Sequence, residues 1–212
     1  MTNETKQVKL HSRGGAKRLA RIALFTALMA VCAQISIPLP GGVPITLQTL
    51  AVMMASIALG FDGVAAVAVY VFLGLIGVPV FSKFGATASL VSPTGGYIVG
   101  FLPMSALMAT IIKTFEKRNE NGLKYAEKRG GARRCFLVFA IASLLGTIVC
   151  YTFGSAWFIG LFALKGAEKS IGYVLSVCVV PFILPDLLKI ALASYLGMVM
   201  RKTVRKTVRK NA

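Results

Sequence analysis

Two charged residues, Asp186 and Lys189, lie inside an otherwise apolar segment of the chain, residues 171–200. Their spacing of three residues places both side chains on one face of a helix. A charged side chain at the middle of a bilayer costs about 2.5–3.5 kcal/mol on insertion scales. Two such charges therefore indicate either a structural ion pair that holds a bent helix, or one wall of a pocket in which a polar ligand satisfies them.

Two prolines, Pro181 and Pro185, stand just before this pair. Proline removes a backbone N–H donor and clashes with the preceding turn, so we expect a helix to begin or kink here. Backbone carbonyls freed in this way are tolerated in a membrane only where protein or a cavity satisfies them. The prolines therefore favour the pocket over the purely structural pair.

The composition is that of a membrane protein. Of the 212 residues, 56% are hydrophobic and 15% are charged, and the mean hydropathy is +0.75. A soluble domain carries about 25% charged residues. Because nearly all of the charge lies outside a few long apolar runs, we predict an all-α, multi-pass protein of the cell (plasma) membrane without a separate soluble module.

The net charge of +17 has a distribution that argues against nucleic-acid binding. Most of the 24 Lys and Arg residues lie in three stretches, residues 6–21, 113–134 and 201–210. Positive charge concentrated in alternate connections is typical of the cytoplasmic side of a membrane protein. The same charge favours contact with anionic lipid head groups.

We expect six membrane helices, at about residues 17–36, 47–59, 64–78, 95–114, 135–161 and 181–200. They form one membrane domain, residues 17–200, between a polar basic arm (1–16), disordered or lying at the membrane surface, and a basic tail (201–212). An even number of spans puts both termini on one side. The arm, the basic loop at about 115–134 and the tail then all lie on that side, which predicts cytoplasmic N and C termini.

The connections at residues 38–46 and 81–93 are rich in Pro, Gly and small residues and lie on the opposite side. A pocket beside them would open near the extracellular face.

We expect Asp62 and Thr94 to cap the helices that follow them. Gln48, near the start of a short helix, either faces the pocket or caps that helix.

Small residues four apart indicate close approach of helices. Gly96 and Gly100 have this spacing, and so do Ala23 and Ala27 on the first helix. The alanine pair either receives another helix or packs internally.

The four cysteines show no CxxC pair, and the single histidine, His11, lies in the polar arm. This pattern predicts neither a disulfide framework nor a metal site.

Five short stretches of the chain resemble one family. They are Pro38-Leu39-Pro40, residues 43–50 (VPITLQTL), residues 76–81 (IGVPVF), residues 93–97 (PTGGY), and Pro181-Phe182 with Asp186 and Lys189. In this order, over about residues 20–200, they resemble the BioY family, the biotin-specific substrate-binding (S) components of energy-coupling factor (ECF) transporters. Residues 82–86 depart from the glycine-rich loop of that family, and Ser92 stands where a glycine is usual.

The resemblance implies six membrane helices, a high-affinity biotin site near the outer face, and import rather than enzymatic activity. It also implies a transmembrane coupling protein and two ATP-binding-cassette ATPases as partners. The chain has no GxxxxGK[ST] sequence, so we expect ATP to be bound only by partner subunits and no cofactor here. Ala23 and Ala27 match the AxxxA pattern that these components use against the coupling protein.

Biotin fits the charged pair in two ways. Asp186 can accept from a ureido N–H while Lys189 donates to the ureido carbonyl, or Lys189 can pair with the valerate carboxylate. The other substrate-binding residues expected from the resembling stretches are Gln48, Ile45, Thr94, Gly95, Tyr97 and Phe182. Small-molecule sites typically combine such apolar walls with a few fixed polar contacts.

Three other functions are weighed against biotin capture. The chain is an S component for another vitamin, a stand-alone secondary transporter that uses Asp186 and Lys189 as an ion-coupled pair, or an intramembrane enzyme with Asp186 as acid or base. Secondary transporters often show inverted repeats, and none is found. No second carboxylate or histidine lies in the apolar runs, which argues against the enzyme.

Overall fold

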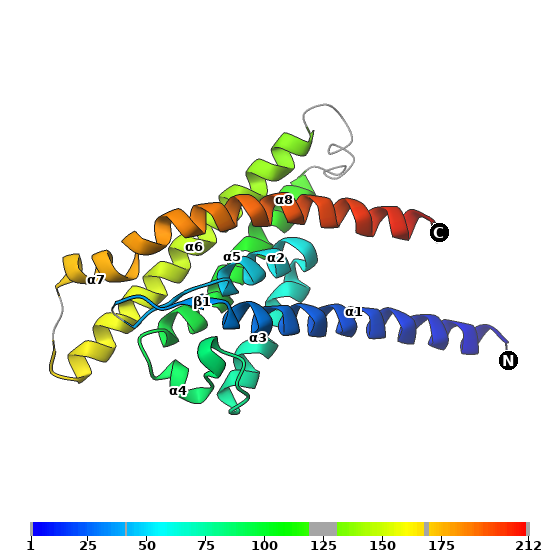
Figure 1. Cartoon of the computed structure of the whole chain (residues 1–212). Helices are drawn as coiled ribbons and strands as arrows, with labels where there is room; N and C mark the ends of the chain where they lie inside the picture. The colour runs from blue at the N-terminus through cyan, green and yellow to red at the C-terminus, as the bar shows by residue number, and fades with distance from the viewer. Residues whose placement is uncertain (1, 41, 119–130, 168–169, 211–212) are drawn as a thin grey trace.

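The chain folds as a bundle of helices with one very short pair of strands. The computed structural model describes residues 2–40, 42–118, 131–167 and 170–210 (Figure 1). The elements in chain order are α1 (Thr2–Gln34), β1 (Ser36–Ile37), β2 (Ile45–Thr46), α2 (Gln48–Leu59), α3 (Phe61–Leu75), the 3₁₀ turn η1 (Ser82–Phe84), α4 (Thr87–Leu90), α5 (Gly95–Arg118), α6 (Gly131–Leu164), α7 (Ile171–Cys178) and α8 (Val180–Lys210). The mostly helical architecture confirms the predicted fold class at this level.

Three of the described helices are long and apolar enough to cross a membrane: residues Gly95–Lys117, Ala132–Leu164 and Ile171–Arg201. Two shorter apolar helices, α2 and α3, accompany them. Figure 1 shows the N-terminal end of α1 and the C-terminal end of α8 at the same end of the bundle. The number of spans, and the side of the membrane on which these two ends lie, stay predictions.

Glycines let α5 and α6 pack closely, and this is the most extensive helix contact among the described elements. A Cβ atom on Gly96 would lie 2.2 Å from the Cβ of Trp157, and one on Gly100 would lie 3.1 Å from the Cβ of Phe153. The spacing of Gly96 and Gly100 predicted such an approach, and the structure confirms it. The contact fixes one wall of the site described below.

The helix that carries Asp186 begins where the prolines predict. The backbone leaves the helical conformation at Val179 (φ −126°, ψ −56°), between α7 and α8. Pro181 occupies the first turn of α8, where a missing N–H is harmless, and Pro185 lies inside the helix. The break therefore lies one to two turns before Asp186.

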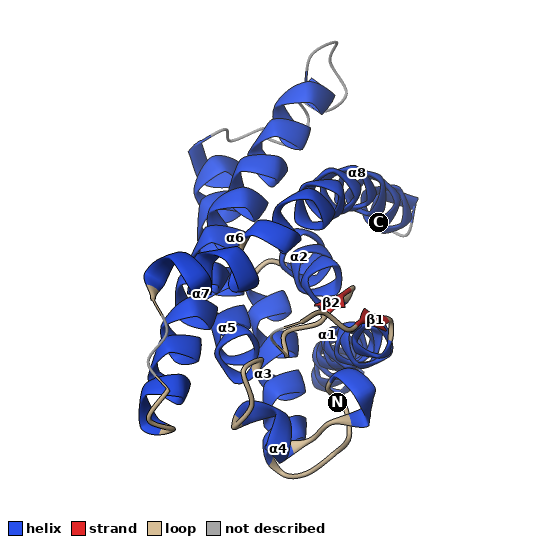
Figure 2. Cartoon of the chain, turned by 60° about the vertical axis from the view of Figure 1, so that its left-hand side comes forward, coloured by secondary structure: helices blue, strands red, loops and turns tan. Residues whose placement is uncertain are grey.

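The connection after α1 folds back as a small hairpin that no sequence pattern predicted. Ser36 pairs with Thr46 and Ile37 with Ile45, and the Leu47 N–H donates to the Ile35 carbonyl at 3.2 Å. Figure 2 shows these strands beside the end of α1. The hairpin holds the loop after β1 against the bundle.

Several predicted boundaries differ from the structure. α1 begins at Thr2 rather than at residue 17, so the basic arm continues the first helix, and α8 continues to Lys210 rather than ending at 200. α5 and α6 extend into the predicted basic loop, whose centre, residues 119–130, lies outside the described residues. Charged residues mark where a helix leaves the bilayer, but Lys and Arg are good helix formers and do not end it.

The prediction that Asp62 caps the third helix is wrong. Gly60 occupies the cap position, with no side-chain hydrogen bond to the helix. Asp62 lies in the first turn instead, and its carboxylate pairs with Arg18 of α1 at 2.7 Å. Because α3 begins at Phe61 rather than at residue 64 as predicted, Asp62 lies past the cap position.

Candidate functional site

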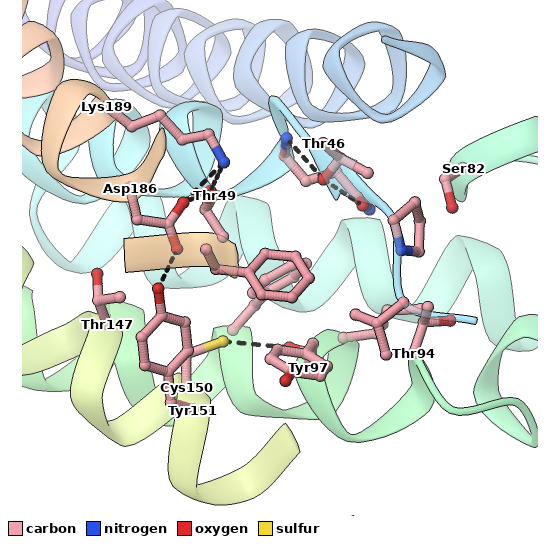
Figure 3. A pocket seen from close by; sticks show the side chains of 16 residues that line it. Thr46, Thr49, Ser82, Thr94, Tyr97, Thr147, Cys150, Tyr151, Asp186 and Lys189 are labelled. Atoms are coloured by element: carbon pink, nitrogen blue, oxygen red, sulfur yellow. Dashed lines mark hydrogen bonds and ion pairs between the residues drawn. The ribbon is translucent and has the colours of Figure 1, made fainter. Parts of the chain in front are cut away.

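One pocket gathers most of the residues expected to bind a ligand (Figure 3). Its walls come from the segment at residues 43–49, from η1, from the start of α5, and from the facing sides of α6 and α8. Six of the eight predicted binding residues line it: Gln48, Thr94, Tyr97, Phe182, Asp186 and Lys189. The pocket is therefore built from segments far apart in the sequence.

The charged pair lies at one end of the pocket. The Lys189 ammonium nitrogen is 2.7 Å from Asp186 Oδ1, and the two residues are only 6% and 3% exposed. Thr49 of α2 joins them, because its hydroxyl accepts from Lys189 at 3.1 Å and lies 3.5 Å from Asp186 Oδ1. Buried charges are tolerated where they are paired and hydrogen-bonded in this way.

The second carboxylate oxygen has a separate partner. Tyr151 of α6 donates its hydroxyl to Asp186 Oδ2 at 2.6 Å, and Figure 3 shows its ring below the carboxylate. Hydrogen bonds to a charged acceptor are about twice as strong as neutral ones. Both oxygens of Asp186 are thus held by protein groups from different elements.

Tyr97 and Phe182 form part of the apolar wall. Their ring centroids lie 6.2 Å apart, and both side chains are buried. The Tyr97 hydroxyl donates to the Cys178 carbonyl at 2.6 Å. That carbonyl lies at the break between α7 and α8, so Tyr97 both lines the pocket and satisfies a backbone group that the break leaves free.

Gln48 lines the pocket rather than capping α2. The residue is buried, and its amide nitrogen donates to the Tyr70 hydroxyl, which in turn donates to the Val80 carbonyl at 3.1 Å. Leu47 occupies the cap position without a side-chain bond. Of the two roles left open for Gln48, the structure therefore favours the pocket.

Thr94 immediately precedes α5 and lines the pocket. Its carbonyl accepts from the Tyr97 and Ile98 N–H groups, as that of a cap residue does. Its hydroxyl instead contacts Ser92 Oγ at 2.7 Å and donates to the Ser89 carbonyl at 3.2 Å. The hydroxyl therefore stabilises the preceding turn.

Two predicted binding residues do not line the pocket. Ile45 pairs with Ile37 in the hairpin and supports the neighbouring lining residues. A Cβ on Gly95 would lie 1.9 Å from the Leu90 carbonyl oxygen, so this glycine permits the turn into α5. Both positions are direct neighbours of lining residues without lining the pocket themselves.

Sequence reasoning missed Thr49 and Tyr151 as members of the polar cluster. Thr49 lies in the resembling stretch at residues 43–50, which was a usable signal. Tyr151 lies in the middle of an apolar helix, where the hydroxyl was the sole indication. Cys150 and Thr147 of α6 also line the pocket.

The alanine pair lies on the outside of α1. Ala23 and Ala27 are exposed, as is Leu24 between them, at 66%, whereas Phe25 and Met29 of the same helix are buried. The pair is therefore not used for packing within the described chain. A role against a partner helix stays a prediction.

The arrangement is suited to binding rather than to bond-breaking chemistry. The pocket has mainly apolar walls and one polar end that carries no net charge, with a carboxylate, an ammonium and two hydroxyl groups. Among the described residues, no three His, Cys, Asp or Glu side chains come together as metal ligands. A small molecule with an apolar body and a neutral polar head matches this distribution.

Comparison with known proteins gives a consistent result. The model of the BioY family matches residues 2–206. The biotin transporter BioY of Thermotoga maritima is 36% identical over 188 residues, which cover 88% of this chain and 96% of that protein. The probable biotin transporter BioY of Pyrococcus horikoshii is 36% identical, covering 84% and 92%. A crystal structure of the S-component for biotin from an ECF-type ABC transporter matches with a TM-score of 0.71 and 27% identity over 95% of each chain.

Proposed function

This chain belongs to the BioY family, and from that membership we propose that it is the biotin-capturing subunit of a vitamin importer. It is a multi-pass membrane protein that acts in transport and not as an enzyme. The observation that carries the proposal is the pocket itself, in which Asp186 and Lys189 form a buried, charge-balanced end beside the rings of Tyr97 and Phe182.

The chemistry of biotin suits this distribution. Its ureido ring places an N–H donor beside a carbonyl acceptor, and its thiophane ring and valeryl chain are apolar. Asp186 accepts from the N–H, Lys189 donates to the carbonyl, and the apolar groups lie along Tyr97 and Phe182. The alternative, in which Lys189 meets the valerate carboxylate, would leave Asp186 facing that carboxylate as well, because the two residues are 2.7 Å apart. Repulsion between like charges disfavours this orientation.

The membrane arrangement that we propose has six spans, namely α1, α2, α3, α5, α6 and α8, with both termini in the cytoplasm. Three apolar helices of membrane length support it. The basic residues at the start of α1, at the join of α5 and α6, and at the end of α8 support the orientation. In this orientation the pocket opens near the extracellular face.

The proposed partners are a transmembrane coupling protein and two ATP-binding-cassette ATPases. The solved relative is an S-component of an ECF-type ABC transporter, and this chain has no P-loop sequence of its own. The exposed face of α1 that carries Ala23 and Ala27 offers small side chains on which a partner helix can pack closely. Energy for release of biotin then comes from ATP bound by the partner subunits.

The proposal is tested by the ligand that the chain retains. The protein is purified alone in detergent from cells grown with a mixture of vitamins, and the bound small molecule is released and identified by mass spectrometry. Biotin in about equal molar amount to the protein supports the proposal. Another vitamin in that amount would keep the architecture and overturn the assignment of the substrate.

A further inference from the structure

Asp186 has two oxygens that are held by two different helices. Lys189, on the same helix as Asp186, bonds Oδ1 at 2.7 Å. Tyr151, on α6, bonds Oδ2 at 2.6 Å. The carboxylate therefore connects α8 to the facing wall of the pocket.

These partners, and not the rotamer, set the plane of the carboxylate. The terminal torsion of an aspartate side chain has a broad, roughly two-fold energy profile, so packing of the Cβ alone leaves the two oxygens free to turn. Thr49 restrains the same oxygen as Lys189, because its hydroxyl lies 3.5 Å from Oδ1. Tyr151 is the one described group that restrains Oδ2 by a hydrogen bond.

A count of hydrogen-bonding sites shows what the cluster leaves for a ligand. The Lys189 ammonium has three N–H donors, and Asp186 and Thr49 use two of them. The Asp186 Oδ2 atom accepts from Tyr151 and keeps a further acceptor site. The charged pair thus leaves one N–H donor on Lys189 and one acceptor site on Asp186 Oδ2 for a ligand, with no net charge.

We propose that Tyr151 is a specificity-determining positioning residue, which fixes Asp186 Oδ2 so that the site selects a neutral ring edge carrying an N–H donor beside a carbonyl. This rests on the proposed function and deepens it. The Tyr151 hydroxyl donates its one hydrogen bond to the carboxylate and therefore does not donate one to the ligand. Its effect on binding passes through the orientation of Asp186.

A comparison in which both the protein and the ligand are changed distinguishes this positioning role from a merely structural one. Tyr151→Phe removes only the hydroxyl, and Tyr195→Phe on α8, at a residue that is 56% exposed, is the matched control. Each variant is titrated calorimetrically with biotin and with two analogues methylated at one or the other ureido nitrogen. Wild type is expected to reject at least one analogue.

We expect Tyr151→Phe to weaken biotin binding about tenfold or more, and Tyr195→Phe to bind as wild type does. For the analogue whose methyl blocks the N–H facing Asp186, the losses from methylation and from Tyr151→Phe are expected to be non-additive. Equal weakening for biotin and both analogues would mean a structural role and would overturn the inference, as would unchanged biotin affinity.

A second comparison, of Tyr151→Phe in the wild-type and Asp186→Asn backgrounds, keeps the inference testable if one variant folds poorly. In the Asp186→Asn background, Tyr151→Phe is expected to cost far less affinity than it does in wild type, because the carboxylate that it orients is gone. Equal losses in both backgrounds would contradict the role. Failure of wild-type protein to bind biotin is a different result, which overturns the proposed function and not the geometry of the cluster.

Discussion

The Tyr97 hydroxyl of α5 donates a hydrogen bond of 2.6 Å to the Cys178 carbonyl at the break between α7 and α8. The break is needed because Pro181 and Pro185 interrupt the backbone bonding just before Asp186. A free carbonyl inside a membrane protein must find a partner within the protein. A side chain of the pocket wall thus also stabilises the helix start that presents the charged pair.

Tyr97→Phe is expected to lower the free energy of unfolding by about 1–3 kcal/mol, since it leaves the buried Cys178 carbonyl without its donor. Thermal unfolding in detergent measures the change, with Tyr195→Phe as a control that removes an exposed hydroxyl from α8. Unfolding temperatures that agree for Tyr97→Phe and the control would show that the carbonyl is satisfied in another way.

Gly96→Ala is expected to destabilise the protein by about 1–3 kcal/mol through overpacking. The new methyl group would lie 2.2 Å from the Trp157 Cβ and 2.7 Å from the Phe153 carbonyl oxygen, and neither atom is the end of a flexible side chain. Gly160→Ala on α6 is the matched control, because nothing lies within 4 Å of its added Cβ. The two variants are compared by thermal unfolding, and equal stability would contradict the close approach of α5 and α6.

Arg201 joins four helices at the end of the bundle remote from the pocket. It donates to the Ile57 carbonyl at 2.6 Å, pairs with Glu116, and lies 5.2 Å from the centroid of the Phe139 ring. Arg201→Ala is expected to cost about 1–2 kcal/mol of stability, with biotin affinity unchanged in the folded fraction. Arg134→Ala, an exposed arginine, is the control. A loss of biotin affinity without a loss of stability would contradict this structural role of Arg201.

A bulky residue on the outer face of α1 is expected to separate capture from transport. Ala27→Trp should leave biotin binding by the purified chain unchanged and lower biotin uptake by cells that contain the coupling protein and ATPases, since close helix contact requires small residues. Ala68→Trp, at an exposed alanine of α3, is the control. Uptake that falls equally in both variants would show that α1 is not the partner surface.

The sequence predicts the charged end of the pocket well, for a physical reason. Asp186 and Lys189 are costly in an apolar segment, and their spacing alone places them together. The cost of burial could not reveal Tyr151 and Thr49, because placing a hydroxyl group in a membrane helix costs little free energy. Whether it points to a pocket depends on the rotation of its helix against another.

In the fold, too, some features follow from local sequence and others depend on tertiary packing. The break before Asp186 follows from Pro181, and the α5–α6 contact follows from the spacing of Gly96 and Gly100. The β1–β2 hairpin contains only two residues in each strand, too few to give a periodic pattern. Its position depends on packing against α1, which local sequence does not encode.

Calorimetric titration of the purified protein with biotin, alongside Asp186→Asn and Lys189→Ala, tests the central claim most directly. We predict one biotin per chain for the parent and a loss of about 2–5 kcal/mol of binding free energy in each variant, because each change leaves the remaining partner unpaired in a buried site. Well-folded parent protein that binds no biotin, or variants that bind biotin as tightly as the parent does, would contradict the account.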